Sequence, residues 1–249
     1  MKKLYVFFIF FYFTTSVFAI SPHYKKPRNV VAIDNTTVLF LDFESINSTQ
    51  AHDLSQSHNN GTISGATRTV DEYGQYLSFG IMGSSVDCGN DSSLDITTTL
   101  TMSAWITIST TYAEPNYGRI LIKGNDDAAG YQMAIWKDGG SPIEILCNIC
   151  SSGTDSNGIQ AEVADAGLSL YIWAHIVGVY DSGWTIYVNG VSQTTTTGAT
   201  LASYGSGSNL FIDNSAFAGN IDDVKIYSRA LTAQEIIDLF ESTRGRYGI

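Results

Sequence analysis

The sequence predicts an all-β protein, a sandwich of two packed antiparallel sheets with one short amphipathic helix near the C-terminus. Strand-like segments follow one another closely and are separated by turns rich in Gly, Asn, Asp and Ser, which is typical of a sandwich. Gly, Ser, Thr, Tyr and Phe are plentiful, whereas helix-forming segments are rare. The chain is 44% hydrophobic and 15% charged, which excludes a disordered chain and a solvated helical rod.

The clearest strand is predicted over residues 100–108, because its side chains alternate strictly between two faces. One face is apolar throughout, and the other carries Thr101, Ser103, Trp105 and Thr107. Further strands are predicted at residues 38–44, 75–79, 119–123, 131–136, 143–149, 173–180, 184–188, 210–212 and 224–227. Asn189-Gly190, which lies between strand-like segments, predicts a two-residue hairpin of type I′.

The helix is predicted after Thr232. Thr232 and Glu235 have the spacing of a capping box, in which the Thr side chain caps the helix and the Glu side chain reaches back. An apolar stripe follows, made of Ile236, Ile237, Leu239 and Phe240. We therefore expect this helix to pack on the sandwich.

The N-terminus has the pattern of a secretory signal peptide over residues 1–19. A basic start precedes an apolar run too short to span a bilayer, and Val17-Phe18-Ala19 suits signal peptidase. The alternative is an uncleaved membrane anchor. Residues 20–37 are expected to be a leader and residues 38–249 one domain, which makes the protein secreted. No second apolar stretch is long enough for a membrane span.

The charge balance and the cysteines exclude further classes. The net charge is −11, and removing residues 1–19, which carry two lysines and no acids, takes it to −13. Such an acidic chain is not expected to bind nucleic acid. Cys147 and Cys150 have redox-motif spacing, but they lie in a strand-like run, which argues against redox chemistry. A zinc site is not indicated either, because the sequence has no second pair of cysteines with this spacing. A local disulfide between Cys147 and Cys150, or a bridge to Cys88, is the simpler interpretation.

Several segments, in order, resemble the laminin G-like jelly-roll family of the concanavalin A-like lectin/glucanase superfamily. They are residues 39–44, the Asp/Asn/Gly-rich residues 53–62, and residues 77–80, 100–106, 173–181, 186–190 and 217–232. The most specific is the closing run Ile221-Asp222-Asp223-Val224-Lys225-Ile226-Tyr227. The resemblance implies a jelly roll used extracellularly for binding and adhesion, often with calcium, whose members bind glycans or proteins. Fold alone does not choose among these ligands.

Four residues are candidate calcium ligands: Asp222, Glu44, Asp42 and Asn60. By alternation, Asp222 is expected on the same face as Val224 and Ile226, where a carboxylate needs a cation or donors. Asp42 and Glu44 are expected to share a face of the first strand, which in the resembled family neighbours the last one. Oxygen ligands brought together in this way suit calcium. The alternative is that Asp222 accepts backbone hydrogen bonds and that Asp42 and Glu44 are solvated.

Four aromatic residues are candidate ligand-binding residues: Trp136, Tyr112, Tyr117 and Tyr204. They lie in or beside loops rich in Gly, Asn and Asp, where a binding edge for a sugar could form. The alternative is ordinary exposed aromatic side chains. For Trp105 the resemblance implies a structural role under a loop, and the alternative is that it lines a concave sheet face. We expect core positions for Trp173 and Trp184.

No catalytic residues are predicted. The Glu-x-Asp-x-x-Glu motif of the superfamily's retaining glucanases is absent, and the four histidines suggest no catalytic triad. His175 resembles a structural position of the family. The leading hypothesis is therefore a secreted, non-catalytic module that recognises a glycan or glycoprotein with structural calcium. The alternatives are a structural or adhesive domain that contacts another protein, and a polysaccharide-active hydrolase or lyase.

Overall fold

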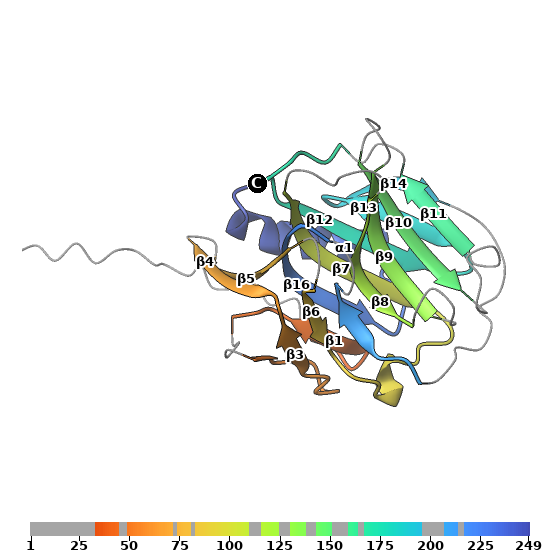
Figure 1. Cartoon of the computed structure of the whole chain (residues 1–249). Helices are drawn as coiled ribbons and strands as arrows, with labels where there is room; N and C mark the ends of the chain where they lie inside the picture. Colours follow the sequence, from red (N-terminus) through yellow and green to blue (C-terminus); the bar gives the residue numbers. More distant parts are fainter. Residues whose placement is uncertain are drawn as a thin grey trace, which may run out of the picture.

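The computed structural model describes residues 33–44, 49–71, 74–80, 83–109, 116–124, 130–137, 143–150, 159–163, 167–195, 207–213 and 217–249. The predicted signal peptide lies outside these residues. Strands β1–β16 form two antiparallel eight-stranded sheets that face each other, which confirms the predicted sandwich (Figure 1). No helix in these residues is long and apolar enough to cross a membrane.

Sheet A contains the first and last strands of the described chain as direct neighbours. Its order is β14 (Val191–Thr195), β13 (Trp184–Val188), β12 (Ala174–Tyr180), β7 (Leu100–Ile108), β16 (Gly219–Tyr227), β5 (Gly74–Phe79) and β4 (Thr67–Asp71). Strand β1 (Thr37–Leu41) pairs antiparallel with β16. The expected contact between the first and last strands is thus confirmed.

Sheet B lies opposite sheet A. Its order is β11 (Ile159–Val163), β10 (Glu144–Cys150), β9 (Gly130–Lys137), β8 (Asn116–Lys123), β15 (Leu210–Ile212), β6 (Ser85–Asp87), β3 (Gly61–Ser64) and β2 (Gln50–Ala51). Strands β7, β13 and β15 have the predicted bounds, and most other predicted strands differ by a few residues at their ends. The strands that were not predicted are short or polar and have no clear apolar alternation.

The core lies between the sheets and is built from the inward residues of both. Met102 and Ile106 of β7 and Met133 of β9 belong to one fully buried cluster. The sheets approach closely where Gly178 of β12 faces Cys147 of β10: a Cβ added at Gly178 would lie 2.5 Å from Cys147 Sγ. A larger residue at position 178 would therefore push the two sheets apart.

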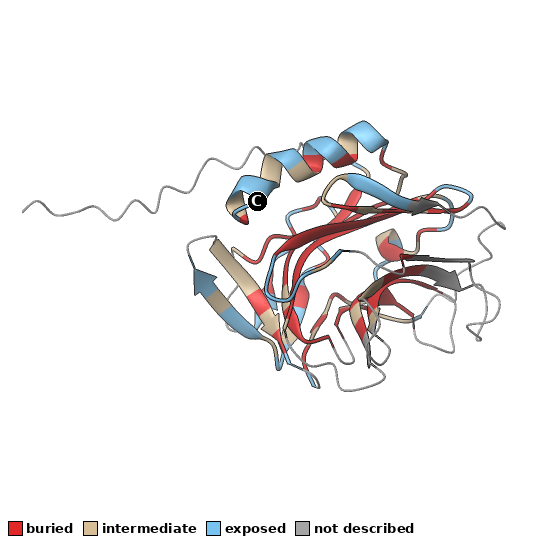
Figure 2. Ribbon diagram, turned by 90° about the horizontal axis from the view of Figure 1, so that it is seen from above, coloured by how far each residue is buried: buried red, intermediate tan, exposed pale blue. Residues whose placement is uncertain are grey.

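Helix α1 (Ala233–Thr243) covers the outer face of sheet A. The capping box is confirmed, because Thr232 Oγ1 accepts from the Glu235 N–H while the Glu235 side chain accepts from the Thr232 N–H. Ile236 and Leu239 are buried against Val177 of β12 and its neighbours, and the helix's opposite side is exposed (Figure 2). A 3₁₀ turn, η3 (Arg244–Arg246), continues the chain along this face.

The β13–β14 hairpin confirms the turn predicted at Asn189-Gly190. Both residues have positive φ, 50° for Asn189 and 78° for Gly190, which is what a type I′ turn requires. Asn189 Oδ1 also accepts from the His175 N–H at 2.9 Å, so the turn is tied to β12.

Candidate functional site

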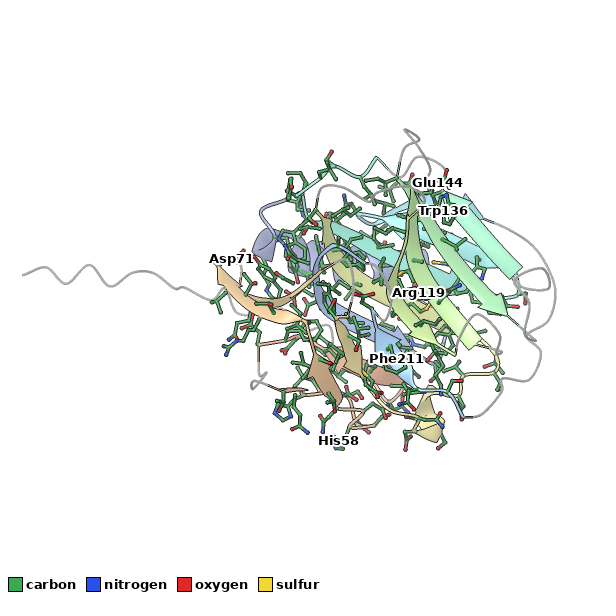
Figure 3. The ribbon with its side chains drawn as sticks, viewed as in Figure 1. His58, Asp71, Arg119, Trp136, Glu144 and Phe211 are labelled. Atoms are coloured by element: carbon green, nitrogen blue, oxygen red, sulfur yellow. The ribbon has the colours of Figure 1, made fainter. Side chains whose placement is uncertain are left out.

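Helix α1 does not cover the outer face of sheet B, although several residues of this face, among them Gln132 and Leu146, are buried. In β9, Met133 and Ile135 point into the core, so the alternate residues Gln132, Ala134 and Trp136 face outward. The same alternation turns Glu144 of β10 and Phe211 of β15 outward. Figure 3 shows Trp136, Glu144, Arg119 and Phe211 distributed over the strands of this sheet.

The pairing registers arrange these residues in rows across the strands. Glu144 is opposite Trp136, and Trp136 is opposite Tyr117 of β8. Two residues along β9, Ala134 is opposite Arg119. The Arg119 Nε donates to Gln132 Oε1 at 3.4 Å, so a guanidinium and a carboxamide are fixed beside the aromatic row.

This arrangement combines the groups that hold a sugar. An indole ring offers a flat apolar surface to the C–H face of a pyranose ring, and neighbouring charged groups such as those of Arg119 and Glu144 exchange hydrogen bonds with hydroxyls. Trp136, Arg119, Glu144 and Phe211 are each half-buried, so each keeps part of its surface accessible. Their backbone positions are set by paired strands, which limits the reorganisation that binding requires.

Two of the four predicted ligand-binding aromatics are brought together here. Trp136 and Tyr117 are register partners on adjacent strands, and Tyr117 lies in the first residues of β8. Strand β8 begins at Asn116, because Asn116 pairs with Lys137 of β9 and extends the β8–β9 ladder past Tyr117. Tyr112 and Tyr204 lie outside the described residues.

Sequence reasoning missed the polar partners of Trp136. Arg119, Gln132 and Glu144 are ordinary surface residue types, and neither composition nor loop position singles them out. The alternation of β9 could have indicated Gln132, because Gln132 and Trp136 are four residues apart and therefore lie on the same face of the strand. Register across to β8 and β10 depends on tertiary pairing and on a bulge between Arg119 and Leu121.

The outer face of sheet A is closed by the C-terminal segment. Trp105 of β7 is 1% exposed and stacks on Tyr247, with ring centroids 4.0 Å apart. His175 and Phe240 stack on the same indole at 5.1 and 5.8 Å. The structural role expected for Trp105 is thereby confirmed, as are the buried positions of Trp173 and Trp184.

Two of the predicted calcium ligands converge on a cation that the chain itself supplies. Arg246 Nη2 lies 2.7 Å from Glu44 Oε1 and 2.8 Å from Asp222 Oδ2. Arg246 Nη1 lies 3.3 Å from Asp223 Oδ2. We call Glu44, Asp222, Asp223 and Arg246 the carboxylate–arginine cluster.

The face predicted for Asp222 is wrong, because β16 changes its alternation at one residue. Asp223 has a φ of 46°, and the β16–β7 register shifts between Asp222 and Lys225. Val224 therefore points into the core, whereas Asp222 lies on the outer face opposite Trp105. Asp222 is still only 1% exposed, because the C-terminal segment covers it.

The placement predicted for Asp42 and Glu44 on the first strand is also wrong. Strand β1 ends at Leu41, and Phe43 has a φ of 51°, so both acids follow the strand. Asp42 Oδ1 accepts from the Glu44 N–H at 3.0 Å, which stabilises this turn. The turn directs Glu44 towards Arg246.

Asn60 has a structural contact in a different loop. Its Oδ1 accepts from the Asp53 N–H at 2.9 Å, while Asp53 accepts from the backbone N–H groups of Phe40, Ser55 and Asn59. Among the residues that the structure describes, no group of three or more His, Cys, Asp or Glu is arranged to hold a metal. Calcium binding by Asp222, Glu44, Asp42 and Asn60 stays a prediction.

The cluster perturbs the ionisation of its members. Burial raises the pKa of Asp222 well above its usual value, the charge of Asp223 adds to the effect, and Arg246 opposes it. The Tyr247 hydroxyl donates to Asp222 Oδ2 at 2.9 Å, and burial raises the pKa of Tyr247 as well. The cluster thus depends on Arg246 for charge compensation.

A buried Ser–His pair next to this cluster is structural. Ser103 Oγ and His175 Nε2 are 2.8 Å apart, but the two residues are 0% and 1% exposed, so a substrate cannot reach them. Burial lowers the pKa of His175 to about 3, with nearby Lys225 acting in the same direction. The ring is neutral at physiological pH.

The disulfides predicted for Cys88 and for Cys147 are both wrong. Cys88 and Cys147 are free, buried thiols in the structure. Cys147 faces Gly178 in the core, whereas Cys88 lies near Gly61 of β3. Burial raises the pKa of each thiol, so neither is a reactive thiolate.

A family profile matches the middle and C-terminal parts of the sequence. The Laminin_G_3 profile, described as the concanavalin A-like lectin/glucanases superfamily, matches residues 80–237, more than half of the chain. The matched region runs from the end of β5 into α1, so it contains the strands that carry Trp136 and Asp222. No curated protein sequence matches the chain significantly.

Solved structures share the fold at low sequence identity. The binding domain of Paraclostridial Mosquitocidal Protein 1 is 18% identical with a TM-score of 0.67, and the match covers 85% of this chain and 53% of that chain. A structure of botulinum neurotoxin type C, whose cell entry depends on interaction with two ganglioside molecules, is 14% identical with a TM-score of 0.66, covering 85% and 52%. The binding domain of botulinum neurotoxin DC in complex with rat synaptotagmin II has the same four values. The chain spans about half the length of these structures.

Proposed function

The chain belongs to the laminin G-like family of the concanavalin A-like lectin/glucanases superfamily, and we propose that it is an exported, non-catalytic binding module that holds a glycan on the outer face of sheet B. The observation that carries this proposal is the row of Glu144, Trp136 and Tyr117 on three adjacent strands, with Arg119 beside it. Export follows from the signal pattern of residues 1–19.

The choice of sheet B follows from what covers the two sheets. Helix α1 and the C-terminal residues bury the outer aromatic of sheet A, Trp105, whereas the outer aromatic of sheet B, Trp136, is half-buried. A ligand can therefore reach an indole face only on sheet B among the described strands. The adjacent strands β8, β9 and β10 present a continuous surface, on which an extended sugar chain can lie across the strands.

The similar structures support a glycan or a protein as partner. One belongs to a protein whose cell entry depends on gangliosides, and another is a complex with synaptotagmin II. The aromatic row beside the charged groups of Arg119 and Glu144 favours the glycan for this chain. Binding of a protein partner that free sugar does not compete away would instead support the adhesive alternative.

The test is glycan-array binding by the wild-type chain and by Trp136→Ala and Trp136→Phe. Loss of the ring is expected to weaken binding at least tenfold, about 1.4 kcal/mol, while the phenyl ring restores part of it. Val191→Ala, which removes an exposed apolar side chain from β14 of sheet A, is the control and is expected to bind as the wild type does. Unchanged binding by a folded Trp136→Ala protein would exclude this face.

Structural calcium is a separate part of the proposal, which the sequence motivates. Calcium would be held by carboxylate and amide oxygens such as those of Asp42 and Asn60, and at Asp222 and Glu44 it would compete with Arg246. The measurement is the melting temperature in calcium against that in chelator. A melting temperature that does not rise in calcium would exclude it.

A further inference from the structure

Three consecutive large apolar residues project into solvent on the loop that leads into β12. Leu170, Tyr171 and Ile172 are 42%, 60% and 58% exposed. We call residues 170–172 the apolar tip, and we propose that it inserts into the interfacial region of an electrically neutral lipid bilayer. This site is distinct from the outer face of sheet B and does not depend on glycan binding.

The tip is held rigidly although its side chains are exposed. Leu168 before it packs against the core, and Trp173 after it is 7% exposed, in contact with Tyr76 and Tyr247 at centroid distances of 5.2 and 5.0 Å. The loop is thus fixed on both sides. A side chain that is exposed on a fixed loop is presented continuously to a partner, which reduces the entropy lost on binding.

The backbone of the tip is strained at Tyr171. Tyr171 has a φ of 62°, a left-handed conformation that is rare for a bulky residue. Asn or Gly would adopt this conformation with less strain. Strain of this kind is retained where the surrounding structure maintains it, and it is concentrated at functional sites.

Two backbone donors of the tip are already bonded within the protein. The Tyr171 N–H donates to Ile108 O at 2.8 Å, and the Ile172 N–H donates to Ser169 O at 3.3 Å. Backbone donors that are already bonded within the protein can enter an apolar region without losing a partner. Tyrosine places its ring in the apolar boundary and its hydroxyl among headgroups, which is why it is enriched at membrane interfaces.

Charge selects a neutral surface over an anionic one. Residues 167–174 contain no charged residue, so the tip itself carries no electrostatic attraction for lipid headgroups. The whole chain has a net charge of −11, which repels anionic lipids. A convex tip also needs no preformed pocket, which a bilayer does not offer and a protein partner would have to provide.

The test is co-flotation of the full chain with vesicles that contain no sugar headgroup. Wild-type protein is expected to partition measurably onto phosphatidylcholine vesicles and several-fold less onto vesicles rich in phosphatidylserine. Tyr171→Ser with Ile172→Ser is expected to lower the partition coefficient at least tenfold. Val191→Ser, which removes a side chain that is 61% exposed elsewhere, is the matched control and is expected to leave it unchanged.

A second variant separates membrane binding from folding. Tyr171→Asn is expected to raise the melting temperature, because Asn adopts the left-handed conformation more easily, and yet to weaken vesicle binding. No flotation of wild-type protein at millimolar phosphatidylcholine, or unchanged flotation of the folded double variant, would overturn the proposal. A preference for the anionic vesicles would also overturn it. Plain vesicles carry no glycan, so the outcome is independent of the glycan array.

Discussion

Replacing Arg246 by Met tests the carboxylate–arginine cluster directly. The substitution keeps most of the alkyl stem and removes the charge that faces Glu44, Asp222 and Asp223 at 2.7, 2.8 and 3.3 Å. Asp222, which is 1% exposed, would keep the Tyr247 hydroxyl and the Asp223 N–H as donors but lose its cation.

The expected loss of unfolding free energy is about 3 kcal/mol. Breaking a buried ion pair by removing one partner costs about 3 to 5 kcal/mol, and the lower end applies because Arg246 and Glu44 retain 14% and 13% exposure. For a domain of this size, that loss corresponds to a melting temperature lower by roughly 6 to 12 °C. Arg244→Met is the control, because Arg244 and its partner Glu241 are 44% and 51% exposed, and we expect a change below about 0.5 kcal/mol.

The deficit of Arg246→Met should depend on pH in a defined direction. The folded-state pKa of Asp222 is raised, so its protonated form is favoured by folding, and this contribution is lost as pH rises through that pKa. Without Arg246 the pKa rises further, so acid neutralises the uncompensated carboxylate. The difference from wild type should therefore shrink as the pH falls from neutral.

Urea unfolding followed by tryptophan fluorescence measures these differences for both variants at each pH. Two results would refute the reasoning. One is a loss for Arg246→Met no larger than that for Arg244→Met at neutral pH. The other is a deficit that grows as the pH falls.

Three further predictions concern the core, the buried histidine and metal binding. Gly178→Ala is expected to lower the free energy of unfolding by about 1 to 3 kcal/mol, because the new methyl group clashes with Cys147. Adding Cys147→Ala should recover part of this loss in a double-mutant cycle, and additive losses would contradict the contact. Burial lowers the pKa of His175 to about 3 in the folded state, below the value near 6.5 of the unfolded state. The neutral ring therefore makes its full contribution to the free energy of unfolding above pH 6.5, and roughly 4 to 5 kcal/mol of that contribution is lost as the pH falls towards 3. His175→Gln should flatten that slope in acid titrations of urea unfolding, and an unaltered slope would assign it to other groups. By calorimetry, Arg246→Met should bind calcium more tightly than wild type, because calcium held as proposed would need Asp222 and Glu44, which the guanidinium contacts in the wild-type chain; equal affinities would contradict competition at these carboxylates.

The sequence predicts most of this fold because local patterns and the fold agree. Strand β7 has strict alternation, and Asn189-Gly190 and the Thr232–Glu235 capping box are short-range signals that need no tertiary information. The site is less predictable. Simple alternation predicts that Asp222 faces the core, but the left-handed conformation of Asp223 reverses the alternation, and Asp222 faces outward.

Long-range contacts account for the other discrepancies. Calcium was the cation expected beside Asp222, whereas the cation that contacts it in the structure is Arg246, which follows 24 positions later in a 3₁₀ turn without any pattern. The partners of Trp136 come from β8 and β10, and only the sheet register places them beside it. Rules based on residue spacing do not contain that register.

The position of β16 makes completion of sheet A a late event during synthesis. This strand ends at Tyr227, yet it pairs with β7, β5 and β1, and Glu44 bonds to Arg246 across 202 residues. Until β16 leaves the ribosome, β7 and β5 each present an unpaired edge, which is a template for aggregation. Such non-local pairing slows folding. The nascent chain is therefore expected to need shielding of these two edges by a chaperone until the last strand is inserted between them.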